Sequence, residues 1–397
     1  MKKRILSILL LCCMVLGLLP TTAFATSELR DSTNVTVTFD STGGSAVEPQ
    51  SVPQGQLVQR PADPIKDGYT FIGWYNKDDL QYSNMPEWNF SYPVTKDLEL
   101  VAQWMEARPI STEPITYLDK DGKQQVCNEY TVLTSETKES ILDYADKWYD
   151  LPAGWYVVEG DVTITPRVDT HGAVNLILTD GSHLTAEWGI NVKKDDTFTV
   201  YAQSTGEDTM GRLTACLPED FNSDGNVRYY VWPDRGLSGI GAGKRCRKAN
   251  IIYENEGTII INGGNIQAKG QRQASAIGGT YSLTVIPSQD IPRQGGTIII
   301  NGGIVRTEAL EKGNDTVVDS VGIGTFGYGG SVTINGGTVI AEAANDAITT
   351  GQGGSITING VRWNLDDMVE KGGFESRESL VATAIENKLM VTTLKDE

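Results

Sequence analysis

The chain contains little histidine, few aromatic residues and no excess of positive charge. Its two histidines, His171 and His183, leave few candidates for a histidine metal site or a Ser-His-Asp triad. Acidic residues outnumber basic ones by 51 to 33, and the net charge of −18 opposes binding to a phosphate backbone. Aromatic residues make up 8% of the chain, whereas 43 residues are Gly, a composition that favours turns and strands. We therefore expect an all-β protein without a nucleic-acid partner.

Long hydrophobic runs are also missing, apart from one at the start. Residues 1–25 open with three basic residues, continue with an apolar run and end at Ala23-Phe24-Ala25. This is the order of a secretory signal peptide cleaved after Ala25. No later stretch approaches the roughly 20 apolar residues of a membrane-spanning helix. The sequence thus predicts a protein of the cell envelope or extracellular space, whose mature chain has no transmembrane segment and a net charge of −21.

Cysteine is scarce in the mature chain. Two of the five Cys lie in the signal peptide, which leaves Cys127, Cys216 and Cys246 and permits at most one internal disulfide. All three could be inert thiols. Alternatively, Cys246 is a reactive thiolate, because Lys and Arg residues flank it on both sides. The sequence leaves the state of the three thiols open.

Residues 35–104 have the pattern of a compact β module. Residues 35–39 alternate between apolar and polar side chains, residues 69–75 are dense in aromatics, and residues 98–104 form a last strand. We expect Trp74 and Trp104 to pack in the core of this module. The strings VTVTFDSTGGSAVEPQSV and GYTFIGWYN resemble an internalin-type B repeat, also called the Listeria–Bacteroides repeat. The resemblance implies a β-grasp-like fold, a cell-envelope location and a spacer or adhesive role without catalytic residues.

A repeat dominates the second half of the chain. Four segments share a strand followed by Asn and Gly, at residues 257–264, 296–303, 330–337 and 354–360. Their Asn residues are 39, 34 and 24 residues apart, and the shortest spacing suits one coil of a parallel β-helix. A second unit recurs out of phase, at residues 238–241, 275–278, 321–324 and 346–349. The sequence therefore predicts a right-handed parallel β-helix with at least two corners per coil.

The repeat also predicts which side chains point inward. Alternation along a strand places Ile334 in the core and Thr333 outside. The Asn after each strand is expected to stack on the Asn of the next coil and to hydrogen-bond along the solenoid. Short apolar runs at residues 162–164, 174–178, 189–192 and 197–201 are expected to form the first coils.

Each end of a solenoid requires a cap. Helical spacing of apolar residues within 140–148, and of Val381, Ala384, Ile385 and Leu389, predicts two short capping helices. The predicted order of domains is signal peptide 1–25, linker 26–34, repeat module 35–104, connector and N-terminal cap 105–160, parallel β-helix 161–361 and C-terminal cap segment 362–397. Residues 115–361 resemble glycine-rich β-helix surface proteins of gut Gram-positive bacteria, which implies a fold and a location but no activity.

Charged motifs outside the repeat leave calcium as an open question. Lys269, Glu308 and Glu342 each lie seven residues after a repeat Asn, so we expect them to stack. The two glutamates could hold Ca²⁺ or share a proton, or the three residues could form a solvated ladder of charges. Residues 220–225, starting at Asp220, match the first half of a calcium loop. The second half fails, because Arg228 and Val231 stand where ligands are needed, so an Asx-rich turn is the alternative.

The expected function follows from what these motifs lack. The outward residues of the repeat strand contain no carboxylate: Ile260, Ile299, Thr333 and Thr357. We assign no catalytic, cofactor-binding or metal-ligating residue and expect a non-enzymatic protein that mediates attachment or recognition of an extracellular polysaccharide or a host or cell-wall component. Insertions at residues 242–256, 279–294 and 311–319 are the expected binding edge. The alternatives are a carbohydrate-binding protein, with Tyr229, Tyr230 and Trp232 as a stacking surface, and a polysaccharide lyase or hydrolase.

Overall fold

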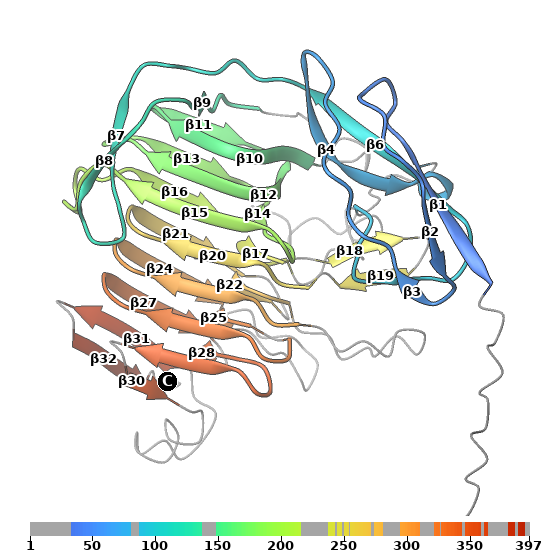
Figure 1. Ribbon diagram of the computed structural model, residues 1–397. Coiled ribbons are helices and arrows are strands. Elements are labelled where there is room, and N and C mark those ends of the chain that lie inside the picture. The colour runs from blue at the N-terminus through green and yellow to red at the C-terminus, as the bar shows by residue number, and fades with distance from the viewer. Residues whose placement is uncertain are drawn as a thin grey trace, which may run out of the picture. The chain divides into compact units, whose positions relative to one another are not determined.

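A computed structural model shows that the chain is an all-β protein (Figure 1). It describes residues 33–80, 87–136, 148–215, 237–242, 244–247, 250–253, 255–270, 274–280, 294–309, 321–325, 327–343, 346–358, 361–363, 380–385 and 388–393. Within these residues the only helix is one 3₁₀ turn, η1 (Lys77–Asp79). None of the helices in this part of the chain is long and apolar enough to span a membrane.

The repeat module is built on one four-stranded sheet. Its strands lie in the order β2 (Gln50–Pro53), β1 (Asn34–Asp40), β6 (Leu98–Glu106) and β4 (Tyr69–Asn76), and β3 (Gln56–Leu57) pairs with β5 (Pro93–Val94). Trp74 is fully buried, and Phe39 and Phe71 pack edge-to-face against it. Trp104 packs edge-to-face on Phe71, and its ring is partly exposed. The prediction of a core role is confirmed for Trp74, while Trp104 lies at the margin of the core.

The downstream strands stack as coils of a parallel β-helix with three faces. Face A consists of β14 (Ile190–Asn191), β17 (Ile240–Gly241), β22 (Ser275–Gly278), β25 (Val321–Gly324) and β28 (Asp346–Thr349). Face B consists of β15 (Thr197–Ala202), β20 (Thr258–Ile261), β23 (Thr297–Ile300), β26 (Ser331–Ile334) and β29 (Ser355–Ile358). Face C consists of β11 (Asp161–Ile164), β13 (His183–Ala186), β16 (Arg212–Ala215), β21 (Asn265–Lys269), β24 (Ile304–Ala309) and β27 (Thr338–Ala343). Both recurring units and the four early strands are therefore where the sequence predicted them.

Faces A and B are continuous in the first coils. β10 (Trp148–Val158) pairs in parallel with β12 (Arg167–Leu178) along both faces, with a register shift between Pro152 and Gly154. β12 then pairs with β14 at its start and with β15 at its end. Gly172 lies between these two pairings with φ +77°, a conformation that Gly adopts readily. The corner between the two faces is thus formed within single strands, and it becomes a separate segment only in later coils.

The predicted inward and outward positions are confirmed. In β26, Val332 and Ile334 are fully buried, while Ser331 and Thr333 are partly exposed. The same alternation is present in β20, β23 and β29, so branched aliphatic side chains of consecutive coils stack in one core. The Asn ladder is also present, because Asn301 Nδ2 donates to Asn262 Oδ1 at 2.7 Å and Asn335 Nδ2 donates to Asn301 Oδ1 at 2.8 Å.

The prediction of a helical C-terminal cap is wrong. Residues Val381, Ala384, Ile385 and Leu389 lie in an antiparallel hairpin of β31 (Leu380–Ile385) and β32 (Lys388–Thr393), and β31 pairs with β27. A short strand, β30 (Val361–Trp363), likewise pairs antiparallel with β29. β-branched residues alternate at Val381, Thr383 and Ile385, and pairing with them covers the open edge of face C.

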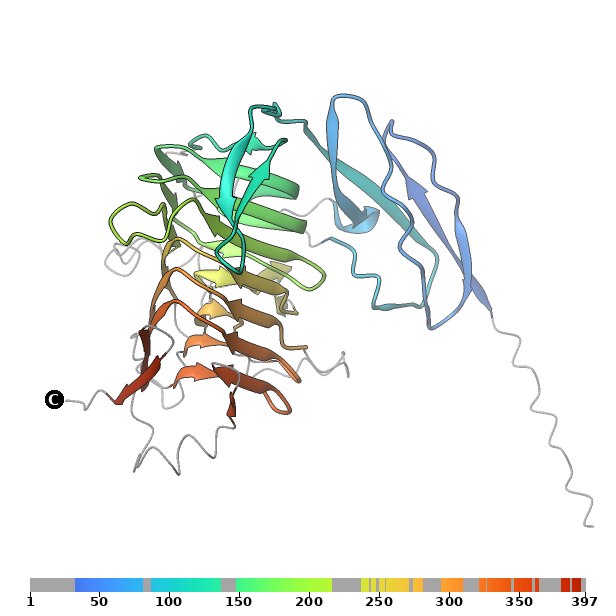
Figure 2. The same cartoon turned by 60° about the vertical axis from the view of Figure 1, so that its left-hand side comes forward.

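The N-terminal end is covered by strands as well. β9 (Thr131–Val132) pairs with β10, and Glu136 forms a bridge with Ile164 of β11. The hairpin of β7 (Ile115–Leu118) and β8 (Gln124–Cys127) lies beside the first coils, as Figure 2 shows. The helix expected within 140–148 falls outside the described residues except for Trp148, which begins β10.

Candidate functional site

Polar side chains gather at the corner of the first three coils, where faces A and B meet. Asp150 comes from β10, Asp169 and His171 from β12, and Lys193 and Asp196 from the turn between β14 and β15. Asp195 in that turn has φ +72°, which Asp tolerates better than most residues. Because the chain returns to this corner once per coil, residues about one coil apart in sequence become neighbours. We call these five residues the corner cluster.

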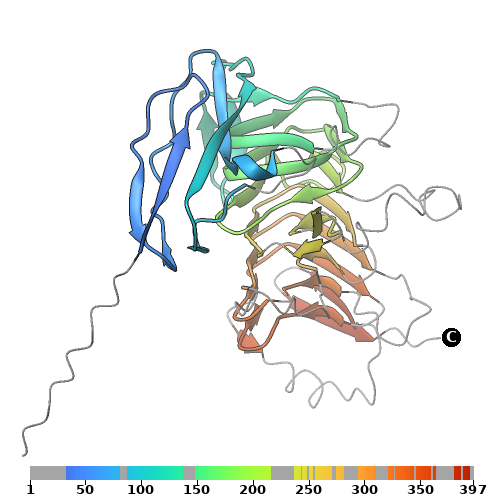
Figure 3. The same cartoon turned by 90° about the vertical axis from the view of Figure 1, so that its right-hand side faces the viewer.

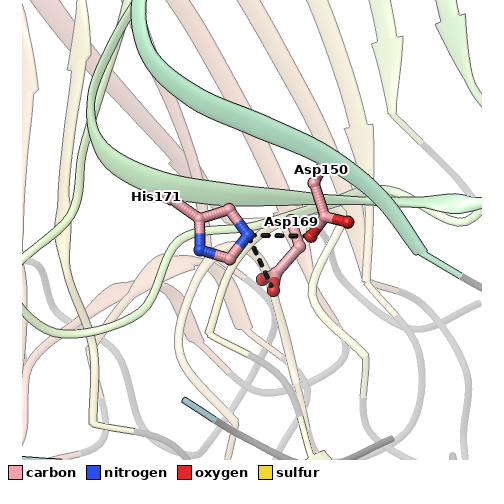
Figure 4. Close-up of side chains that lie close together, drawn as sticks. All are labelled: Asp150, Asp169 and His171. Carbon is pink, nitrogen blue, oxygen red and sulfur yellow. Dashed lines mark hydrogen bonds and ion pairs between the residues drawn. The ribbon is translucent and has the colours of Figure 1, made fainter. Parts of the chain in front are cut away.

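His171 lies between two carboxylates (Figure 4). Its Nε2 is 2.8 Å from Asp150 Oδ1 and 3.6 Å from Asp169 Oδ2. The His171 and Asp169 side chains are nearly inaccessible, at 6% and 4% exposure, whereas the Asp150 side chain is 35% exposed. Because a carboxylate can only accept hydrogen bonds, His171 Nε2 carries a hydrogen and donates a hydrogen bond to Asp150.

Lys193 joins the buried carboxylates on the other side. Its Nζ is 3.1 Å from Asp196 Oδ2 and 3.7 Å from Asp169 Oδ1, and it donates to the carbonyl oxygen of Thr170 at 2.5 Å. Asn191 Nδ2 donates to Asp169 Oδ1 at 2.7 Å. One ammonium therefore faces two buried carboxylates, and the hydrogen bonds of the backbone and of Asn191 stabilise them further.

Asp196 is the residue whose ionisation the corner disfavours most clearly. Its Oδ1 accepts from the Gly172 N–H at 2.7 Å, and its Oδ2 accepts from the Thr170 hydroxyl at 3.0 Å. Burial nevertheless raises the pKa of Asp196 from 3.8 to about 6, although Lys193 and the Gly172 hydrogen bond lower it. The cause is loss of hydration of the charged carboxylate, with Asp169 adding like-charge repulsion.

A pH-dependent contribution to stability follows from the raised pKa. A carboxyl group with a higher pKa in the folded state binds protons more tightly there, so its contribution is fully present below about pH 4 and is lost as pH rises to about 6. We expect Asp196→Asn to abolish this change in the free energy of unfolding, which amounts to roughly 1–3 kcal/mol between pH 4 and pH 6. The melting temperature of the variant, relative to wild type, should therefore rise between pH 4 and pH 7.

The control for this prediction is Asp195→Asn, which changes an exposed carboxylate on the same turn. Asn is tolerated at positive φ, so the control should preserve the turn. Parallel melting curves of Asp196→Asn and wild type across pH 4–7 would show that the buried carboxyl does not titrate there.

The donor set of the corner cluster invites comparison with a metal centre. Asp150, Asp169 and His171 place three potential ligand atoms within 4.8 Å of one another. A histidine that binds metal through Nε2 must carry a proton on Nδ1, and that N–H normally donates to an acceptor. No described residue accepts a hydrogen bond from His171 Nδ1, which is buried. A ring with its hydrogen on Nε2, donating to Asp150, fits this environment, so the geometry supports a structural hydrogen-bond network that links the first three coils.

The predicted charge ladder on face C is confirmed in its register. Lys269 pairs with Glu308, and Glu308 pairs with Glu342, in adjacent strands. Lys269 Nζ is 3.2 Å from Glu308 Oε2, and both side chains are partly exposed. The ion pair favours the interpretation of a solvated ladder, and a calcium site at Glu308 and Glu342 stays an untested alternative.

Several predicted positions fall outside the described residues. They are the half calcium loop at Asp220–Gly225 with Arg228 and Val231, the aromatic residues Tyr229, Tyr230 and Trp232, and Cys216. Cys246 lies in β18 (Lys244–Arg247), of which the structure describes the backbone. Cys127 is a buried free thiol, and burial raises its pKa.

The predicted insertions flank face A in the chain: the first two lie between a strand of face A and the next strand of face B, and the third lies between strands of faces C and A. The first contains an antiparallel hairpin, β18 with β19 (Asn250–Tyr253), which lies to the right of the coils in Figure 1 and in front of them in Figure 3. Its return segment is fixed where the Asn255 carbonyl oxygen accepts from Lys194 N–H at 2.8 Å. The Asn255 side chain in turn accepts from the N–H of Gln294, at the end of the second insertion. Neighbouring insertions are thus anchored to one another at the corner between faces A and B.

Comparison with known families identifies the first part of the chain. Residues 36–103 match the family model of the Listeria-Bacteroides repeat domain, which confirms the repeat predicted at residues 35–104. The part of the chain that follows this repeat is an all-β solenoid consistent with a parallel β-helix. Residues 36–103 thus form a Listeria–Bacteroides repeat, and the strands that follow form the β-helix.

Two curated relatives come from Evansella cellulosilytica. One is named "Putative membrane protein" and is 36% identical over 70 residues, which cover 17% of this chain and 10% of the relative. The other is named "Putative Gly-rich membrane protein" and is 31% identical over 164 residues, or 38% of this chain and 18% of the relative. The chain thus spans less than a fifth of either relative, and no solved structure matches it. These similarities are consistent with a cell-surface protein.

Proposed function

We propose that the mature protein is a non-catalytic attachment or recognition protein of the cell envelope. The observation that carries the proposal is the position of the insertions, all of which leave the coils at the two edges of face A while the core stack continues unchanged. Loops gathered on one side of a solenoid commonly form its binding face, because they vary without disturbing the core. The Listeria–Bacteroides repeat and the relatives named as membrane proteins support the location.

The polar groups support binding better than catalysis. Lyases and hydrolases of polysaccharides need carboxylates and a base that reach the substrate. The carboxylates of Asp169 and Asp196 are buried and accept hydrogen bonds from their own corner. The outward residues of face B in consecutive coils, such as Ile299 and Thr333, carry no carboxylate.

The proposal is tested with the purified mature chain, residues 26–397, labelled with a fluorophore. We expect it to be retained on isolated bacterial cell walls or on a glycan array, with and without Ca²⁺, and to release no reducing ends from the polymers that it binds. Release of reducing ends or of unsaturated products would replace the proposal with an enzyme. Absence of retention on every surface would refute attachment.

The binding edge has its own prediction. Replacing the insertions 242–256, 279–294 and 311–319 by turns as short as those of the last coil should leave the fold intact, because loop length contributes little to closure entropy. The trimmed protein should no longer bind the cell wall or glycan that retains the intact protein. Far-UV circular dichroism and thermal melting verify the fold of the trimmed protein. Undiminished binding by a folded, trimmed protein would show that the insertions are surface decoration.

A further inference from the structure

Face B carries three columns of outward side chains that lack any charge. Strand pairing aligns them at intervals of about 4.8 Å along the solenoid. The first column contains only hydroxyl residues: Thr197, Thr258, Thr297, Ser331 and Ser355. The second contains Thr199, Ile260, Ile299, Thr333 and Thr357. The third begins at Tyr201 and continues with the ladder Asn262, Asn301 and Asn335.

A surface without charge is unusual in this chain. Charged residues make up 21% of the sequence, and most of the chain's charge is negative. With the exception of Thr199, which is buried, the residues of the three columns are at least partly exposed. Water alone would not select against Lys, Glu or Asp at such positions, since these residues are common on solvated faces. The absence of charge from all three columns therefore indicates that a constraint other than solvation selects uncharged residues on this face.

The other two faces differ from face B. On face A, the strands β22 and β25 are buried along their whole length, so they offer no outer surface. On face C, the outward columns contain Arg212, Arg306, Lys269 and Glu308. Arg306 is engaged with Glu207 at 2.8 Å and with Asn265 at 3.2 Å. Among the described residues, only face B combines exposure, regular spacing and electrical neutrality.

The chemistry of face B defines the class of ligand. Ser and Thr hydroxyls and Asn amides both donate and accept hydrogen bonds. A partner with the same dual capacity at repeated intervals, and without charge, is a neutral polysaccharide. Three partly buried aromatic rings lie at the N-terminal end of the same face, with Trp155 stacked on Tyr201 at 5.3 Å and Tyr117 against both. These rings also pack against the buried cluster of Cys127, Tyr130, Val157 and Ile177, so they bound face B at its N-terminal end.

We propose that face B binds a neutral, hydroxyl-rich polysaccharide chain. Hydroxyl and amide groups of Thr297, Thr333 and Asn301 exchange hydrogen bonds with the polymer, while Ile260 and Ile299 contact its apolar edges. The inference rests on the proposed function, to which it adds the ligand class and the contact surface.

A second copy of the chain fits face B less well. The centre of a protein–protein interface is enriched in aromatic residues, Met and Arg, whereas these columns contain mainly hydroxyls and amides. An acidic polymer would be repelled by the net negative charge of the protein. These two partners therefore serve as contrasting outcomes of the test.

The experiment is affinity electrophoresis and isothermal titration of the mature chain with three neutral polymers, namely mixed-linkage β-glucan, galactomannan and amylose. Polygalacturonate and hyaluronan are the acidic comparison. The decisive variant is Thr297→Asp combined with Thr333→Asp, which introduces two carboxylates on adjacent coils at partly exposed positions. The matched control is Gln267→Glu, which adds a carboxylate at an exposed outward position of face C.

We expect at least one neutral polymer to bind wild type and Gln267→Glu equally, and to bind the face B variant about tenfold or more weakly, because the carboxylates lose hydration against an uncharged ligand. Light scattering and melting curves verify that all three proteins are monomeric and folded. Equal binding of the neutral polymer by the face B variant would overturn the inference while leaving an attachment function through the insertions intact. Binding of acidic polymers alone, or self-association that only the variant loses, would overturn it as well.

Discussion

Ile334→Asp is expected to lower the free energy of unfolding of the β-helix by about 3–5 kcal/mol. Ile334 is fully buried, and its neighbours in the same column of the core are Ile300 and Ile358 of the adjacent coils. An aspartate at this position would place a carboxylate among aliphatic side chains that can neither hydrate nor pair it. Urea unfolding followed by circular dichroism measures the loss.

The matched control is Thr333→Asp, one residue earlier on the same strand. Thr333 points outward and is partly exposed, so its carboxylate would stay hydrated and the expected change is within about 0.5 kcal/mol. If the Thr333 variant were the less stable of the two, the inward and outward positions of face B would be reversed.

Gly278→Ala is expected to have a comparable effect for a different reason. Gly278 ends β22 with φ +128°, a conformation that side chains other than Gly rarely adopt. A Cβ built at this position would overlap the carbonyl oxygen of Gly324, the residue that pairs with it in the next coil. The same crowding recurs one coil earlier, where a Cβ on Gly241 would overlap the Gly278 carbonyl. The loss should be about 3 kcal/mol or more, since backbone strain and steric overlap add together.

Gly353→Ala separates the two causes of this loss. Gly353 has φ +78°, and no heavy atom lies within 4 Å of a Cβ built there. Its substitution should therefore cost only the backbone term, about 1 kcal/mol. Equal destabilisation by the two alanines in urea titrations would mean that the close approach of the coils at face A contributes nothing.

The coils could be predicted because each contains the same short sequence pattern. A strand of alternating side chains, an Asn and a Gly occur at intervals close to one coil length, and residues such as Ile300 and Ile334 then meet by translation along one axis. The C-terminal cap failed for a local reason. The apolar residues Val381, Ala384 and Ile385 satisfy helical spacing, but Val381, Thr383 and Ile385 also satisfy strand alternation, and the unpaired edge of β27 favours the strand.

The corner cluster was missed because its members are not adjacent in sequence and do not repeat. Asp150 and His171 are 21 residues apart, and Gly172 and Asp196 are 24 apart, which is the length of one coil. That spacing was the available signal. It was hidden because the residues between β14 and β15 look like an ordinary polar turn, and because only contact in three dimensions distinguishes a buried carboxylate from a solvated one.

The stacked coils also determine how the protein responds to tension. A coil of 24 residues advances the solenoid axis by about 4.8 Å, yet the same residues span about 80 Å when fully extended. Pulling on one end of the β-helix would peel strands from a neighbouring coil. Each coil that is released would become more than ten times as long as the distance that it occupied along the solenoid axis. A surface protein built in this way lengthens stepwise under load, with the intact coils behind each step still folded.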